Sequence, residues 1–300
     1  MSKKYEFTGE TKTVFGVTLK QIRLLVDIAA LGLAAGAVGG WIEKEENLSQ
    51  VSDNAWVSDN AWVSGNAQVS GNAQVTGDAH VSGDAQVTGD AQVSGDAHVS
   101  GNAWVSGNAR VSGNAWVYGN AQVSGNARVS GNAQVTGNAR VSGNAWVSGD
   151  AHVSGNAWVS GDAQVTGDAQ VTGDAQVTGD AQVTGDAQVS GDAQVTDNAQ
   201  VTDNAQVTGD AQVTDNARVT IVNITAVRTD GYTFSVCATP DGPRIIAGCR
   251  YFTYPEALAH WKEARGGTKL GDESLLIVKH LKAMAKLNGL DKPVKAGADQ

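Results

Sequence analysis

The sequence predicts an all-β solenoid. A six-residue phrase, Ala-x-Val-[Ser/Thr]-[Gly/Asp]-[Asn/Asp], recurs almost without interruption from Val51 to Thr220. Alanine and valine stand two positions apart, so both point to the same side of an extended strand. The Gly-Asn, Gly-Asp or Asp-Asn pair that follows tolerates positive φ and forms a corner. One hexapeptide cannot bury its own valine, so successive coils must stack.

Other secondary structures fit the repeat poorly. A period of six does not match the 3.6 residues of a helical turn, and each recurring glycine would cost a helix about 1 kcal/mol relative to alanine. Hairpins fail because the phrase keeps one direction through every corner. With three hexapeptides per coil, the repeat makes about nine coils, on the order of 45 Å at the usual strand spacing.

The hexapeptides V-S-G-N-A-Q and V-T-G-D-A-Q resemble the repeat of left-handed β-helix proteins, the trimeric acyltransferase-like superfamily. The flanking phrases AGAVGGWIEKEENLSQ (35–50) and GCRYFTYPEALAHW (248–261) resemble the caps of uncharacterised bacterial and phage-borne hexapeptide-repeat proteins. The resemblance implies left-handed coils, a homotrimer, and a phage or prophage setting in which the protein acts on a host protein.

The expected domains are an N-terminal cap (1–50), the β-helix (51–220), a small C-terminal α+β cap (221–290) and a disordered tail (291–300). The N-terminal cap is expected to be helical. Thr18 to Gln21 reads as a capping box, and an apolar face follows it at helical spacing. That face consists of Leu19, Ile22, Leu25, Val26 and Ala29.

The C-terminal cap is expected to begin with strands at 219–227, 232–238 and 244–250, separated by turns. A second capping box, Thr253 to Glu256, predicts a helix that ends near Ala264. A longer helix is expected after Asp272. This element would cover the far edge of the coils or recognise a partner.

Charge restricts the class of partner. The chain has a net charge of −10, and residues 51–218 hold 17 Asp and 4 Arg with no Lys or Glu, giving −13 there and +3 in the flanks. Nucleic acid or anionic lipid is not expected along such a surface, whereas a basic protein remains open, including one for which the chain mimics a nucleic acid. Corner aspartates form partial ladders, which serve turn formation and solubility or attract Ca²⁺.

A soluble, cytoplasmic protein is expected. The most apolar stretch, 24–38, has fifteen residues and includes Asp27, whereas a membrane-spanning helix needs about 20. The two cysteines, Cys237 and Cys249, are expected to be free thiols.

The variable x position carries the candidate binding residues. Stacking in threes puts residues eighteen apart in one column, and the tryptophans, histidines and arginines of these columns face outward. Such side chains are enriched in binding interfaces, although stacked aromatics also stabilise a sheet by about 0.2–1 kcal/mol per pair. The interface candidates are Trp56, Trp62, His80, His98, Trp104, Arg110, Trp116, Arg128, Arg140, Trp146, His152 and Trp158.

The histidines raise the question of catalysis. Enzymes of the resembling superfamily use a histidine at a subunit boundary as general base, which makes His80, His98 and His152 the candidates if the chain transfers acyl groups. No coenzyme motif or loop insertion accompanies them, and a zinc site needs three or four ligands. No cofactor, metal or catalytic residue is therefore predicted.

The predicted function is a non-catalytic, rigid β-helix scaffold that self-associates and binds a protein partner. Two alternatives stay open, an acyltransferase-like enzyme with its site at a trimer boundary and a glycan-binding module that uses the exposed tryptophans.

Overall fold

The computed structural model describes residues 3–51, 53–214, 217–219, 224–237, 239, 242–248 and 250–291. The chain divides into two compact units, Met1–Asn156 and Ala157–Gln300. The division falls inside the hexapeptide repeat, so each unit combines coils with one terminal element. Among the described residues, no helix is both long enough and apolar enough to cross a membrane.

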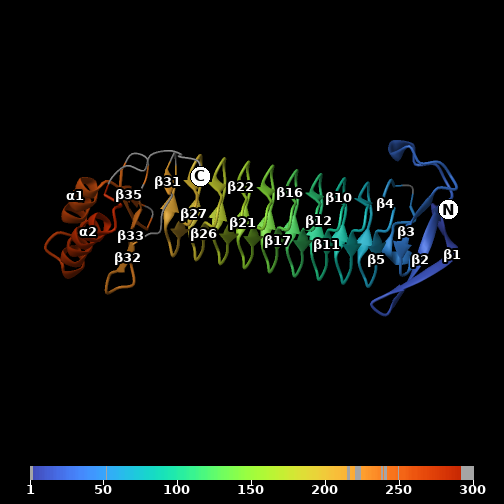
Figure 1. Ribbon diagram of the computed structural model, residues 1–300, viewed down its shortest axis with the longest axis horizontal. Coiled ribbons are helices and arrows are strands. Elements are labelled where there is room, and N and C mark those ends of the chain that lie inside the picture. Colours follow the sequence, from blue (N-terminus) through green and yellow to red (C-terminus); the bar gives the residue numbers. More distant parts are fainter. Residues whose placement is uncertain are drawn as a thin grey trace. The chain divides into compact units, whose positions relative to one another are not determined.

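Each hexapeptide forms one two-residue strand. The strands run from β4 (Trp56–Val57) to β31 (Arg218–Val219) at six-residue intervals, and each consists of the x residue and its valine. A strand pairs in parallel with the strand eighteen residues further on, as Gln92 does with Arg110 and Val93 with Val111. The parallel β-solenoid with three strands per coil is therefore confirmed (Figure 1).

Coils of the first unit form three sheets. The first sheet contains β5, β8, β11, β14, β17 and β20, the second β4, β7, β10, β13, β16 and β19, and the third β6, β9, β12, β15 and β18. In the second unit β21 to β31 repeat the arrangement. Repeat valines and alanines are buried in both units, so the core is made of columns of two small side chains.

Corner glycines are required by two separate constraints. Gly113 has φ +66°, a conformation that L-residues adopt at a cost. A Cβ built on it would lie 3.0 Å from the backbone nitrogen of Gly131 in the next coil. Aspartate replaces glycine at three described corners with positive φ, at Asp59, Asp197 and Asp203.

The N-terminal cap is a β-hairpin, so the predicted helix is wrong. Strands β1 (Tyr5–Val14) and β2 (Val17–Leu24) pair in antiparallel fashion, and Thr18 to Gln21 lie within β2. An irregularity in the pairing of β2 with β3 (Val38–Ile42) interrupts the alternation of buried residues. Buried side chains fall at Leu19, Ile22 and Leu24, whereas Leu25, Val26 and Ala29 of the predicted helical face are exposed.

The hairpin covers the N-terminal edge of the first sheet. β2 pairs with β3, and β3 pairs in parallel with β5 (Trp62–Val63). Leu48 then bridges Val69, whereas Val51 is exposed, so it does not take the valine position that its sequence suggests. Pairing the edge in this way removes a template for aggregation.

The C-terminal element is a four-stranded antiparallel sheet with two helices. Its strands are β32 (Ile224–Val227), β33 (Thr233–Cys237), β34 (Arg244–Ala247) and β35 (Arg250–Phe252), of which the last was not expected. Helix α1 (Tyr254–Arg265) begins at the predicted capping box, where Thr253 and Glu256 bond reciprocally. Helix α2 (Lys269–Leu287) begins three residues before Asp272. Residues 220–223, Cys249 and most of the predicted tail lie outside the described residues.

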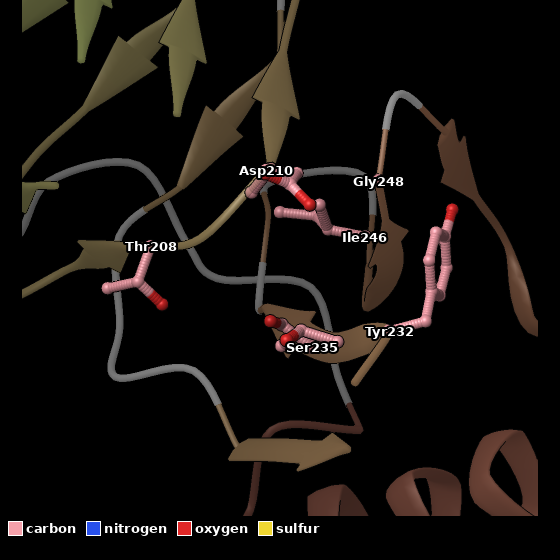
Figure 2. A pocket seen from close by; sticks show the side chains of 8 residues that line it. Thr208, Asp210, Tyr232, Ser235, Ile246 and Gly248 are labelled. Atoms are coloured by element: carbon pink, nitrogen blue, oxygen red, sulfur yellow. The ribbon is translucent and has the colours of Figure 1, made fainter. Parts of the chain in front are cut away.

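This element closes the last coils of its unit. The backbone nitrogen of Gln212 donates to the carbonyl of Gly248 at 3.2 Å. Thr208 and Asp210 from the coils and Tyr232, Ser235 and Ile246 from the sheet enclose a cavity of about 10 Å³ (Figure 2). Such a space holds about one water molecule, so it is a packed joint and not a ligand site.

Candidate interaction surface

An aromatic ladder runs along the outside of the first sheet. Trp62, His80, His98 and Trp116 occupy successive strands in register. Their ring centroids are 4.4, 4.6 and 4.5 Å apart, and the His98 and Trp116 rings are nearly parallel at 21°. Tyr118 meets Trp116 edge-on at 6.5 Å. One strand spacing is thus matched to aromatic stacking distance.

Burial within this ladder makes both histidines weak bases. Burial, together with the neighbouring His98 and Lys12 and against the opposing effect of Asp78 and Asp96, lowers the pKa of His80 to about 4. Burial also lowers the pKa of His98. Both rings are therefore neutral near pH 7, which suits stacking and makes them poor general bases, since a catalytic base works best with a pKa near the working pH.

The His80 shift predicts a loss of stability in mild acid. In the unfolded chain His80 binds a proton near pH 6.5, whereas the folded ring does so only near pH 4. Its contribution is therefore complete above about pH 6.5, decreases as the pH falls toward 4, and is constant below that. We expect a decrease of about 1–2 kcal/mol in urea unfolding, reduced by solvent screening of a half-buried ring. His80→Gln, which installs the commonest residue of this position, should abolish this part of the pH dependence; an unchanged profile would contradict the shift.

Two of the predicted interface residues are core residues. Trp56 is 3% exposed and Trp62 is 8% exposed, because the N-terminal cap lies over both. A Cβ on Gly39 of β3 would come within 2.6 Å of the Trp56 ring, which shows how closely that ring packs on the cap. The expectation that Trp56 and Trp62 face outward is therefore wrong.

The remaining tryptophans of the hexapeptide repeat in the first unit are accessible, one on each sheet. Trp104, Trp116 and Trp146 are 47%, 46% and 43% exposed. The Trp104 and Trp146 indole nitrogens donate to Thr88 Oγ1 and Ser130 Oγ at 3.2 and 3.3 Å, so these rings lie back over the preceding coil. In the second unit Trp158 is 45% exposed.

The arginines lie in the same coils as these tryptophans. Arg110 and Arg128 pair directly on adjacent strands, and Trp146 follows Arg128. Arg140 follows Gln122 on the third sheet. All three arginines are exposed, and none has an ion pair within the described part of the chain.

Residues 97–149 form a belt that differs in charge from the rest of the repeat. The belt contains Arg110, Arg128 and Arg140 and no Asp, Glu or Lys, giving a net charge of +3. Every corner within it is Gly-Asn. The exposed aromatic residues Trp104, Trp116, Tyr118 and Trp146 also lie here. Arginine and aromatic enrichment together with depletion of acids is the composition of protein interface cores.

Neutral amide ladders replace acid at the belt corners. Asn102 donates to Asn120 at 3.0 Å and Asn120 to Asn138 at 2.9 Å, with similar bonds along the other two corners. Each asparagine side chain supplies both donor and acceptor, so stacking is attractive where carboxylates would repel. The corners thus hold a rigid frame without adding negative charge beside the arginines.

His152 stands apart from the other two candidate catalytic residues. Gln134 lies between Trp116 and His152 in the column, so only His80 and His98 are in contact. Within the described residues, no group of three or more His, Cys, Asp or Glu side chains could hold a metal ion. The thiol of Cys237 is buried, which raises its pKa to about 12 and leaves it unreactive.

Part of the repeat is similar to a known family model. The model described as YdcK β-solenoid repeat matches residues 49–65, 67–83, 91–107, 103–119, 121–137 and 133–149. These segments of the coils are similar to that repeat. The matches lie within the first unit and include most of the belt, so the exposed arginines and tryptophans of the belt lie within matched segments. No curated protein sequence matches the chain.

Solved structures similar to this β-solenoid include UDP-N-acetylglucosamine acyltransferases. The Francisella novicida enzyme is 11% identical with a TM-score of 0.29, covering 82% of this chain and 92% of its own. The Arabidopsis enzyme is 10% identical with a TM-score of 0.29, covering 80% and 92%. A putative acetyltransferase from Bacillus cereus is 9% identical with a TM-score of 0.23, covering 64% and 92%.

The eighteen-residue columns of the sequence predict the candidate side chains. The belt can be found only when the net charge is counted separately for each part of the repeat. The uninterrupted run of Asn corners from Asn102 to Asn144 is visible in the sequence. A net charge taken over residues 51–218 hides it, because the acids on either side outnumber the three arginines. The burial of Trp56 and Trp62 has no such signal, since it depends on the path of the cap.

Proposed function

We propose that the chain is a non-catalytic scaffold that self-associates and binds protein surfaces through its belt. The observation that carries the proposal is the placement of Trp104, Trp116 and Trp146 on three rigid β-sheets, each with nearly half its surface exposed, beside arginines that form no ion pair with any described residue. Binding to such a surface loses little conformational entropy, because the backbone of the coils and corners is already fixed before the partner arrives. A phage or prophage origin and a host partner belong to this proposal as the expected setting.

Two features count against the acyltransferase alternative. The rings of His80 and His98 are stacked on their neighbours, and burial keeps their pKa values below the range of an effective base. Belt hexapeptides all have the same length, so no inserted loop shapes a pocket around them. Glycan binding stays a second candidate because exposed tryptophans also stack on sugar rings; the half-exposed Trp116 is the specific observation that favours it.

Glutamine substitution tests the proposal without disturbing the fold. Gln is the commonest x residue, so Trp116→Gln and Trp146→Gln install a side chain that the repeat already accepts. We expect the intact chain to exceed its 30.8 kDa monomer mass in light scattering and either substitution to weaken association at least tenfold. Leu276→Gln, at an exposed apolar residue of α2 outside the coils, is the control.

A monomer at every concentration, with no change between variants, would contradict self-association. Saturable binding of acyl-coenzyme A that is lost in His98→Ala would favour the enzyme. Retention on a glycan array that is lost in Trp116→Gln would favour the lectin-like alternative.

A further inference from the structure

The three belt arginines form no ion pair within the part of the chain that the structure describes. Arg110 and Arg128 stand directly opposite each other on adjacent strands. Like charges in that position destabilise a sheet, by up to about 1 kcal/mol. The corners beside this pair are neutral asparagines, so no neighbouring carboxylate offsets the repulsion between the two arginines. An anionic surface placed over the two guanidinium groups would remove the repulsion and satisfy their donors.

Coils of the second unit carry the opposite charge. Residues 157–217 contain ten Asp and no Lys, Arg, Glu or His, giving a net charge of −10. The described corner aspartates are exposed, and their columns, such as Asp174, Asp192 and Asp210, repeat at one coil per step. The x positions between Gln164 and Gln212 are all glutamine, which supplies further donors and acceptors.

Spacing on the two surfaces matches. Stacked strands are about 4.8 Å apart in any β-sheet, so the Arg110–Arg128 step and the Asp174–Asp192 step have the same length. One coil surface laid along another therefore brings successive arginines to successive aspartates without adjustment. A flexible or globular acidic partner has no such built-in period.

We infer that the belt of one copy binds the acidic coils, residues 157–217, of a second copy. This inference rests on the proposed function and names the partner of the belt. Arg110, Arg128 and Trp146 share the second sheet, and Arg140 and Trp104 share the third. Each of these two sheets therefore places its arginines against the corner aspartates of a separate copy. An in-register parallel trimer would instead place belt against belt and acid against acid, which like-charge repulsion disfavours.

Nucleic acid fits the belt less well. Residues 53–96 carry six Asp and no basic residue, and Asp150 begins the acidic stretch on the other side. The belt spans three coils, roughly 14 Å, so a strand longer than a few nucleotides would meet negative charge at both ends.

Complementation between two charge variants tests the inference. The belt variant carries Arg110→Gln, Arg128→Gln and Arg140→Gln, and the acid variant carries Asp168→Asn, Asp174→Asn, Asp186→Asn and Asp192→Asn. Gln and Asn are the native alternatives at these positions. Lys20→Gln with Arg23→Gln and Lys269→Gln removes the same positive charge elsewhere and serves as the control.

We expect each variant alone to associate at least tenfold more weakly than the intact chain, while the control associates normally. Mixing the two variants should restore association, because the acid variant keeps its belt and the belt variant keeps its acid. Raising salt from 50 to 500 mM should weaken the intact assembly at least tenfold.

Association of both variants at the level of the intact chain would overturn the inference. If Trp116→Gln still abolishes association in that case, the proposed function stands and only the charged pairing fails. Binding of a labelled oligonucleotide that is lost in the belt variant, without complementation in the mixture, would also overturn it in favour of nucleic acid.

Discussion

Replacing Lys4 with methionine is expected to destabilise the N-terminal cap by about 3–5 kcal/mol. The Lys4 side chain is 2% exposed, and its Nζ lies 2.6 Å from Asp53 Oδ1 and 3.0 Å from the Ala55 carbonyl. The other Asp53 oxygen accepts from the Gly71 nitrogen at 3.0 Å, so one carboxylate joins the cap to the first coil. Without the lysine, Asp53 is a largely buried charge that has lost its counter-ion.

Urea unfolding followed by hydrogen exchange of β1–β3 measures the effect. Lys3→Met is the matched control, since the Lys3–Glu45 pair is 2.7 Å long but exposed on both sides. Exposed pairs contribute about 0–1 kcal/mol, so this control should differ little from the intact protein. Equal losses in the two variants would show that burial of the Lys4–Asp53 pair is not what fastens the cap.

Replacing Gly113 with valine is expected to cost about 3 kcal/mol in the first unit. A β-branched residue is strained at φ +66°, and its Cβ would lie 3.0 Å from the Gly131 nitrogen, against backbone that cannot move without shifting the next coil. The measurement is the urea midpoint with exchange rates of neighbouring strands, because coils of a solenoid can open separately.

Gly113→Asp provides the comparison. Asp59 adopts φ 57° at an equivalent corner, and its Oδ2 accepts from the Gly77 nitrogen of the next coil at 3.1 Å. The aspartate variant should therefore lose less than half as much stability as the valine variant. If both variants lose the same amount of stability, the positive φ at position 113 alone determines the loss. The contact of the new side chain with the next coil then does not contribute.

The repeat was predictable because each of its letters has one structural reason. Valine and alanine form the buried columns, and glycine adopts the positive φ that each corner needs. Three hexapeptides make one coil, so residues eighteen apart lie in register. The helix predicted at 18–29 was wrong. Leu19 and Ile22 are three residues apart and both buried, as on a helical face, but they lie in β2, where an irregularity interrupts the strict alternation of a strand. Val51 was expected to be the first buried valine of the repeat, but it is exposed. The chain between Leu48 and Val57 is three residues longer than one repeat, so Val51 falls out of register.

The sequence predicts which candidate residues stack on one another, but it does not predict which of them are exposed. His80, His98 and Trp116 stack as the register requires, whereas Trp56 and Trp62 are covered by a cap whose path no local pattern specifies. At the C-terminal end, the Thr253–Glu256 capping box located a helix to the residue, since reciprocal side-chain bonds fix where a helix begins. β35 was missed because three residues give too short an alternation to recognise.

Hydroxyl-radical footprinting of the unmodified protein at rising concentration tests the central claim most directly. Oxidation of Trp104, Trp116 and Trp146, all nearly half exposed in one copy, is read by mass spectrometry alongside the light-scattering mass. Protection of these three residues that rises with mass, while the exposed Phe15 of the hairpin turn stays reactive, is the result the belt predicts. Association without protection of the belt, or a monomer whose tryptophans stay reactive throughout, would contradict it.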